Sequence, residues 1–231
     1  MSGKQKVKNP REEHYGDMLK WTCCPVFKCL TFTTFILLVD LVMFIVELSL
    51  GLKQQGQFLE VKVDTLIMLG ANYPYDIRQG NVWRLITAAV LHSDFLHFLG
   101  NFVATIIFLS RIEHSFGSGK TILIYTVSAI GGNIFSAVCN AQTIKVGAST
   151  SLYGLLGLMI GYLIINWDGL DLIGPIMKCQ LVCVVMMTLF FIILFTSATG
   201  TENIDYFGHL GGFLTGLWLI CVPTPIISTS R

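Results

Sequence analysis

Long apolar stretches separated by polar connections dominate the hydropathy pattern of this chain. A helix needs about 20 mainly apolar residues to cross a bilayer, and six stretches come close to that length or exceed it. We therefore expect an all-α fold, a polytopic membrane bundle of six transmembrane helices. The predicted spans run roughly over residues 30–50, 94–112, 121–140, 147–165, 178–197 and 206–222.

One connection between the predicted spans is much longer than the others. It covers residues 51–93, and the remaining connections are too short to hold a soluble domain. We predict one membrane domain over residues 30–222, with a cytoplasmic tail at 1–29 and a short one at 223–231.

Composition agrees with a membrane location. Hydrophobic residues make up 53% of the 231 residues, charged residues make up 13%, and the mean hydropathy is +0.68. Soluble domains carry about a quarter charged residues, so this chain is expected to be an integral membrane protein. The net charge of +1 gives no indication of a nucleic-acid partner.

Basic residues are unevenly distributed about the spans. Ten of the 15 Lys and Arg residues lie in or beside the two tails and the second and fourth connections, and five lie by the others. Because Lys and Arg favour the cytoplasmic side, both termini are predicted to be cytoplasmic. Acidic residues near the N-terminus argue against a signal or transit peptide. We expect a multi-pass protein of the secretory pathway or the plasma membrane.

The cysteines and histidines indicate neither a disulfide framework nor a metal site. Cys23, Cys24 and Cys29 precede the first span. We expect free thiols in a reducing cytosol, with S-acylation as the alternative. No HExxH or nucleotide-binding motif is present, so no metal and no cofactor are expected.

Four polar side chains lie inside the predicted spans at one common depth. His97 and Asn101 are in the second span, Ser149 begins the fourth, and His209 begins the sixth. Polar residues are costly within a membrane and are therefore candidates for function. By the predicted topology these three spans all start from the outer side, so the four side chains would meet near the outer leaflet.

Glycines accompany the serine and the histidine. At about 100° per residue, Gly212 lies about 60° and Gly216 about 20° from His209 around the helix. Glycine faces let two membrane helices approach closely, which would bring His209 within reach of the Ser149 hydroxyl. The glycines are Gly208, Gly212 and Gly216 in the sixth span and Gly154, Gly157 and Gly161 in the fourth.

This combination favours nucleophilic catalysis. Ser149 would attack an amide, and His209 would accept its proton and pass it to the leaving amine. His97 and Asn101, spaced i and i+4 on one helix face, would donate to the oxyanion together with the Ser149 amide. Taken singly, a membrane serine usually bonds its own backbone and GxxxG usually marks packing.

Several ordered motifs resemble the rhomboid family of intramembrane serine proteases, in its basic six-span form. The resemblance covers nearly the whole chain from residue 30 on. Its motifs are NVWRLITAAVLH with Trp83 and Arg84, HSDFLHFLGN with His92, His97 and Asn101, EHSFGSGK with Glu113, GASTSLYG around Ser149, and GHLGGFLTG around His209.

The resemblance implies a Ser149–His209 dyad without a third acid, and an oxyanion site of His97, Asn101 and the Ser149 amide. It implies that Tyr153 packs against the catalytic histidine. The other motif residues expected to support the site are His92, Trp83, Arg84, Glu113 and Gly212, with Trp83 and Arg84 shaping the outer loop. Without the family, His92 would be an interfacial residue and Tyr153 an interfacial or core residue. Trp83 and Arg84 would be an aromatic belt with a snorkelling arginine.

The chain departs from the family pattern after the nucleophile. Thr150 stands where the family usually has glycine, and its hydroxyl could bond a nearby carbonyl. Gly208 replaces a frequent alanine before His209. Asp205, four residues before His209, is expected to cap the sixth helix.

The function implied is an intramembrane serine endopeptidase. Its partners would be the lipid bilayer and single-span membrane proteins, cleaved in or near their spanning segment so that the outer part is released. Substrate would enter past the fifth span and the loop SATGTENID. The oligomeric state stays open.

Two other functions stay open at this point. An inactive relative that binds membrane proteins would lack the Ser or the His, and this chain keeps both. A proton-coupled carrier would use the histidines together with Asp40 and Glu47, which share a face of the first span, but no inverted repeat is evident. We expect both carboxyl groups to face the bundle or a water-filled site.

Overall fold

A computed structural model describes residues 30–173, 178–179, 181–183, 185–186, 189 and 204–220. Within these residues the fold is all-helical without a strand, as the hydropathy pattern predicts. Three helices of this described part are long and apolar enough to cross a membrane: Phe32–Leu50, Phe95–Phe116 and Ser118–Cys139. The chain is therefore an integral membrane protein built as a helical bundle.

The long helices coincide with the first three predicted spans. They are α2 (Phe32–Leu50), the continuous helix made of α6 (Phe95–Ala104), η2 (Thr105–Leu109) and α7 (Ser110–Phe116), and α8 (Ser118–Cys139). The fourth and sixth predicted spans coincide with the shorter helices α9 (Ser149–Ile165) and α12 (Tyr206–Leu219), and α10 (Trp167–Ile173) follows α9.

Other predictions fall partly or wholly outside the described residues. The described residues of the fifth predicted span, among 178–189, are helical. Both predicted tails, the cysteines at 23, 24 and 29, and residues 197–203 of the proposed gate loop lie outside. The count of six spans therefore stays a prediction.

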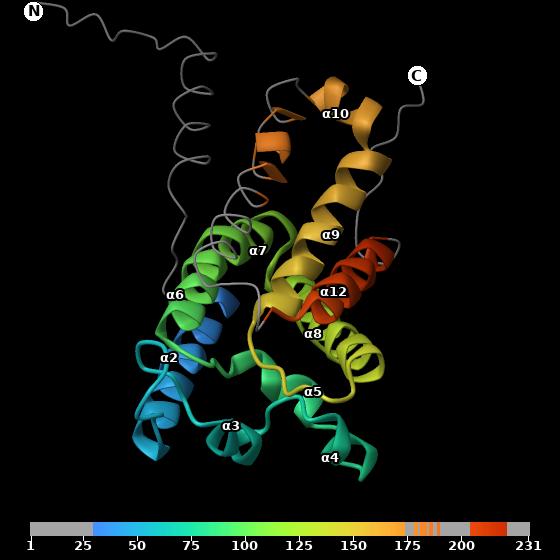
Figure 1. Cartoon of the computed structure of the whole chain (residues 1–231). Helices are drawn as coiled ribbons and strands as arrows, with labels where there is room; N and C mark the ends of the chain where they lie inside the picture. The colour runs from blue at the N-terminus through green and yellow to red at the C-terminus, as the bar shows by residue number, and fades with distance from the viewer. Residues whose placement is uncertain are drawn as a thin grey trace, which may run out of the picture.

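Helix α12 packs against both α8 and α9 (Figure 1). Glycine permits this closeness, because a Cβ atom at Gly216 would collide with the Gly154 carbonyl, and one at Gly212 with the Thr150 carbonyl. A Cβ at Gly132 of α8 would lie 2.7 Å from the Gly208 carbonyl oxygen. The backbones of the three helices are thus in direct contact, as expected for small residues at membrane helix interfaces.

The connection between α2 and α6 folds into short helices at one end of the bundle, opposite α10 (Figure 1). They are α3 (Val63–Leu69), α4 (Pro74–Arg78), α5 (Arg84–Thr87) and η1 (Ala88–Val90). Asn72 ties this connection to α8 by donating to the Asn133 carbonyl at 2.9 Å, and its backbone pairs with Lys145. The segment that precedes α9 is fixed by the same contacts.

Arg84 lies at the centre of this connection. Its guanidinium forms an ion pair with Asp76 at 2.6 Å and donates to the carbonyl oxygens of Ile67 and Ala71 at 2.7 and 3.2 Å. Its side chain is only 7% exposed. The alternative of a snorkelling arginine is therefore wrong, whereas Trp83 beside it is half exposed, as an interfacial residue would be.

Glu113 fixes the opposite end of the bundle. Its carboxylate accepts from the backbone nitrogens of Phe32 and Thr33 at 2.7 and 2.8 Å, from the Thr33 hydroxyl at 2.7 Å, and from the Ser118 hydroxyl at 2.6 Å. The first N–H groups of a helix lack partners within the helix. Glu113 supplies them for α2 and so ties α2, α7 and α8 together.

Asp40 and Glu47 face the interior of the bundle, as predicted. Both are fully buried, and Glu47 Oε1 accepts from the His92 backbone nitrogen at 2.9 Å. Both Asp40 oxygens and Glu47 Oε2 have no hydrogen-bond partner among the described residues. Glu47 thus anchors His92, and with it the segment that leads into α6, to α2.

Replacing Gly216 with alanine is expected to destabilise the protein by about 2–3 kcal/mol, because the new methyl group would meet backbone that cannot rotate away. Gly119→Ala is the matched control, since a Cβ there meets no atom within 4 Å and alanine favours a helix. The measurement is denaturant unfolding of both variants in mixed micelles. Equal stability of the two variants would contradict the close contact.

Arg84→Ala is expected to lower the free energy of unfolding by about 2–4 kcal/mol, because it leaves Asp76 and two carbonyl groups without their cation. Arg78→Ala serves as the control, since among the described residues the Arg78 guanidinium donates only from Nε to the Pro74 carbonyl, at 3.3 Å. The same unfolding assay compares them, and a loss in Arg78→Ala as large as in Arg84→Ala would refute the anchoring role of Arg84.

Candidate functional site

Ser149 and His209 meet where α9 and α12 begin. Ser149 is the first residue of α9 and His209 the fourth of α12. The Ser149 Oγ lies 2.9 Å from the His209 Nε2. This distance suits a hydroxyl that donates its proton to the ring nitrogen, the arrangement of a nucleophile with its base.

Tyr153 packs against the face of the histidine ring. Its ring stacks on the His209 ring with centroids 4.1 Å apart and planes 9° from parallel. In the part of the chain that the structure describes, no carboxylate is hydrogen-bonded to the His209 ring. Stacking and the Ser149 bond therefore fix the ring in place of a third acid.

Asp205 sets the start of α12, as predicted. It is the N-cap residue, and its Oδ1 accepts from the Gly208 backbone nitrogen at 3.0 Å and from the Ser136 hydroxyl of α8 at 2.7 Å. The cap thereby fixes the position of His209 one turn later. Ser136 was not singled out in the sequence, because its partner is 69 residues away.

His97 and Ser149 both lie next to Gly147. A Cβ atom at Gly147 would be 2.7 Å from the His97 Nε2 and 3.6 Å from the Ser149 Oγ, so both side chains border this glycine. Gly147 has a φ of +126°, which side chains rarely tolerate. Sequence reasoning missed this glycine, although it opens the motif around Ser149.

The remaining expected donors are Asn101 and the first N–H groups of α9. Asn101, one turn after His97, donates one of its two Nδ2 protons to the His97 carbonyl at 2.9 Å. The N-cap of α9 is Ala148, whose methyl side chain cannot accept hydrogen bonds from the first N–H groups of the helix. These N–H groups give the start of α9 the character of an anion site.

Two further polar residues support His97 from the start of α6. Asp94 caps α6 by accepting from the His97 backbone nitrogen at 2.9 Å, and its other oxygen accepts from the Ser93 hydroxyl at 2.7 Å. The Ser93 hydroxyl also lies 3.0 Å from the His97 Nδ1. An N-cap signal in the sequence, Ser-Asp before an apolar run, would have found them.

His92 is buried rather than interfacial. It is fully inaccessible, its ring centroid is 5.5 Å from that of His97, and neither ring nitrogen has a described hydrogen-bond partner. Burial is the main cause that lowers the pKa of His92 well below its ordinary value. A neutral ring therefore packs behind His97.

Other residues expected to support the site lie elsewhere. Glu113 is at the far end of the helix that starts with α6, about 18 Å along the axis from Asn101. Trp83 and Arg84 belong to the connection, and Gly212 lies in the contact of α12 with α9. These residues position helices and the connection rather than touch Ser149.

Thr150 corrects one expectation. Its hydroxyl bonds no carbonyl, since Thr150 Oγ1 is buried without a partner among the described residues. The side chain instead fills the junction of the three helices, where a Cβ at Gly132 or Gly208 would lie 3.0 Å from its carbon atoms. Threonine is accommodated there because the neighbouring positions are glycines.

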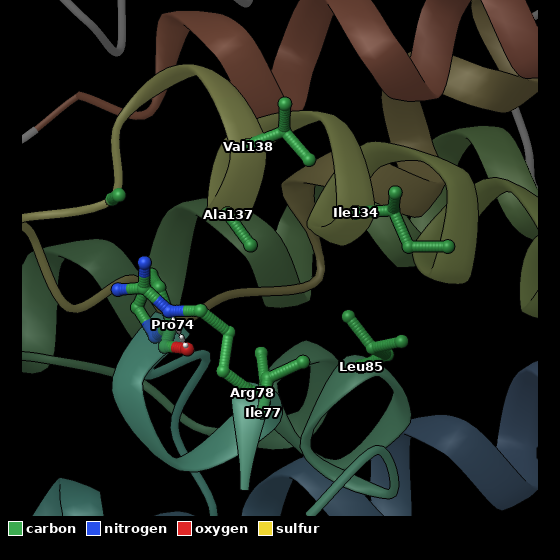
Figure 2. Close-up of a pocket in the computed structure, with 8 residues that line it drawn as sticks. Pro74, Ile77, Arg78, Leu85, Ile134, Ala137 and Val138 are labelled. Atoms are coloured by element: carbon green, nitrogen blue, oxygen red, sulfur yellow. Dashed lines mark hydrogen bonds between the residues drawn. The ribbon is translucent and has the colours of Figure 1, made fainter. Parts of the chain in front are cut away.

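A cavity of about 280 Å³ lies apart from this site, between α4 and the end of α8 (Figure 2). Arg78 is the one charged residue of its lining, and the other lining side chains are alanine, leucine, isoleucine, valine and proline. It contains no nucleophile or base. Among the described residues, no cluster of three or more His, Cys, Asp or Glu side chains could hold a metal ion.

Comparison with known proteins gives a consistent family. A family model described as the Rhomboid domain matches residues 79–224. The chain is 39% identical to RHOMBOID-like protein 6, mitochondrial, of Arabidopsis thaliana, over 72% of this chain and 52% of that protein. It is 32% identical to Rhomboid-like protease 3 of Toxoplasma gondii, over 68% and 57% respectively.

Rhomboid-like protease 2 of Toxoplasma gondii is 30% identical over 91% of this chain and 74% of that protein. The chain spans about half the length of the first two of these curated relatives, 52% and 57%. The matched family model covers most of the helices described above, including both helices that carry Ser149 and His209. The chain therefore belongs to the rhomboid family.

Proposed function

We propose that this chain is an intramembrane serine endopeptidase. The observation that carries the proposal is the 2.9 Å separation of the Ser149 Oγ from the His209 Nε2 inside a membrane protein of the rhomboid family. Relatives named as proteases support the same activity class.

In the proposed reaction, His209 takes the hydroxyl proton of Ser149 as the Oγ bonds to the carbonyl carbon of a peptide bond. The C–N bond then breaks, and the protonated His209 gives its proton to the leaving amine. Water attacks the resulting ester with His209 again as the base, which releases the new carboxylic acid. Tyr153 keeps the ring aligned through both steps.

The oxyanion of each tetrahedral intermediate would form beside Gly147. The proposed donors to it are His97, Asn101 and the Ser149 amide. One such donor is worth roughly 3–4 kcal/mol in a transition state. The absence of a side chain at Gly147 leaves room for the oxygen.

The proposed substrates are single-span membrane proteins cleaved in or near their spanning segment, with release of the outer part. An ideal helix shields its carbonyl groups, so the cleaved segment should contain small or helix-breaking residues. The proposed topology has six spans and cytoplasmic termini, in a membrane of the secretory pathway or at the cell surface. Residues 1–29 and 223–231 would be its tails.

Ser149→Ala and His209→Ala are each expected to lower cleavage of a tagged single-span reporter at least about a thousandfold, because each removes one half of the proton-transfer pair. The assay is co-expression with the reporter, followed by detection of the released outer fragment. Ser151→Ala is the matched control, since it makes the same chemical change two residues along α9.

Cleavage that persists in either dyad variant would reject the proposed function. If a proton-coupled carrier were the true function, solute uptake would instead survive Ser149→Ala and fail when Asp40 and Glu47 are neutralised.

A further inference from the structure

Ser93 and Asp94 form a short hydrogen-bonded chain behind His97. Asp94 Oδ2 accepts from the Ser93 hydroxyl at 2.7 Å, and the Ser93 Oγ lies 3.0 Å from the His97 Nδ1. Asp94 Oδ1 is also bonded to the His97 backbone nitrogen, at 2.9 Å. Both carboxylate oxygens therefore act on one residue, through its backbone and through its ring.

The Ser93 hydroxyl has a single proton, which can be donated either to Asp94 or to the His97 Nδ1. A carboxylate is a stronger acceptor than a neutral imidazole nitrogen, so the proton points to Asp94. The Ser93 oxygen then accepts, and the His97 Nδ1 must carry a proton to satisfy it. The Ser93 backbone nitrogen, 3.5 Å from the Nδ1, is at the limit of hydrogen-bond range and competes weakly.

We propose that Ser93 and Asp94 are positioning residues that hold the proton of neutral His97 on Nδ1 and balance the charge of His97 when its Nε2 donates as well. The role of His97 in this inference rests on the proposed function. The Nε2 is the nitrogen on the side of Gly147, 2.7 Å from where a Cβ atom of that residue would stand.

The consequence is that His97 can donate from Nε2 only after it takes up a second proton, because neutral His97 in this tautomer has none there. Burial of the ring opposes this protonation by solvent hydronium, and the Asp94 charge favours it. Asp94 offsets the resulting charge through Ser93. The other titratable groups around the ring are His92, with its centroid 5.5 Å away, and His209, which interacts electrostatically with both His97 and Lys145.

The test uses the full chain in detergent micelles with ¹⁵N-labelled histidine. The shifts of Nδ1 and Nε2 report which nitrogen carries the proton, and His97→Gln identifies the His97 signals by their loss. Neutral wild-type His97 is expected to be protonated on Nδ1. A wild-type proton on Nε2 would overturn the proposal, whatever the protein cleaves.

Asp94→Asn is the sharpest variant. Asparagine keeps the helix cap through its carbonyl oxygen. Its amide group donates to Ser93, so the Ser93 hydroxyl turns toward His97 and the ring proton moves to Nε2. An unchanged tautomer in a folded Asp94→Asn protein would contradict the proposed role of Ser93 and Asp94.

Ser93→Ala and Ser93→Thr separate positioning from folding. Alanine is expected to give a mixture of tautomers and to lower kcat roughly tenfold with KM little changed, and threonine is expected to restore both. An unchanged kcat in Ser93→Ala, or no rescue by threonine, would refute the positioning role. Because the tautomer is measured without substrate, the experiment distinguishes a failure of the proposed protease activity from a failure of the proposed role of Ser93 and Asp94.

Discussion

Contact between the backbones of α9 and α12 is the constraint on which the rest of the structure depends. A serine side chain is short, so its hydroxyl can reach a histidine on another helix only if the two helix axes are unusually close. Gly154, Gly212 and Gly216 permit that closeness, since a Cβ at any of these positions would meet backbone or side-chain atoms of a neighbouring helix. The 2.9 Å separation of Ser149 from His209 follows from this packing.

Polar anchors at both ends hold the helices around this contact. Glu113 joins α2, α7 and α8 at one end, and Arg84 organises the connection at the other. Each anchor satisfies several groups at once, which an apolar environment demands because unpaired polar groups are costly there. Asp205 and Asp94 also satisfy unpaired backbone groups, since each caps the helix that carries a candidate histidine. The charged residues of the bundle thus fix where helices start, and the glycines fix how closely they pack.

Much of the fold could be predicted because the membrane imposes it. A bilayer requires long apolar helices, so hydropathy alone located α2, α8 and the helix from Phe95 to Phe116. The angular position of Gly216 beside His209 and the cap at Asp205 follow from helix geometry, which is local. These features need no knowledge of tertiary contacts.

The parts that the sequence did not reveal depend on residues far apart in the chain. Nothing in the sequence pairs Asn72 with Lys145, buries Arg84 against Asp76, or leaves the Thr150 hydroxyl without a partner. The positive φ of Gly147 is equally invisible, because it arises from how the chain enters α9. The sequence of Ser93 and Asp94 is that of a helix cap, but the contact of Ser93 with the His97 ring is seen only in the folded structure.

The central claim is that His209 activates Ser149. A fluorophosphonate probe measures this directly, because it forms a covalent bond only with an activated serine, and mass spectrometry locates the modified residue. The account predicts modification of Ser149 in the wild-type chain in micelles, with Ser151 unmodified, and loss of modification in a folded His209→Gln variant. Labelling that persists in that variant would show that Ser149 reacts without His209 and would contradict the account.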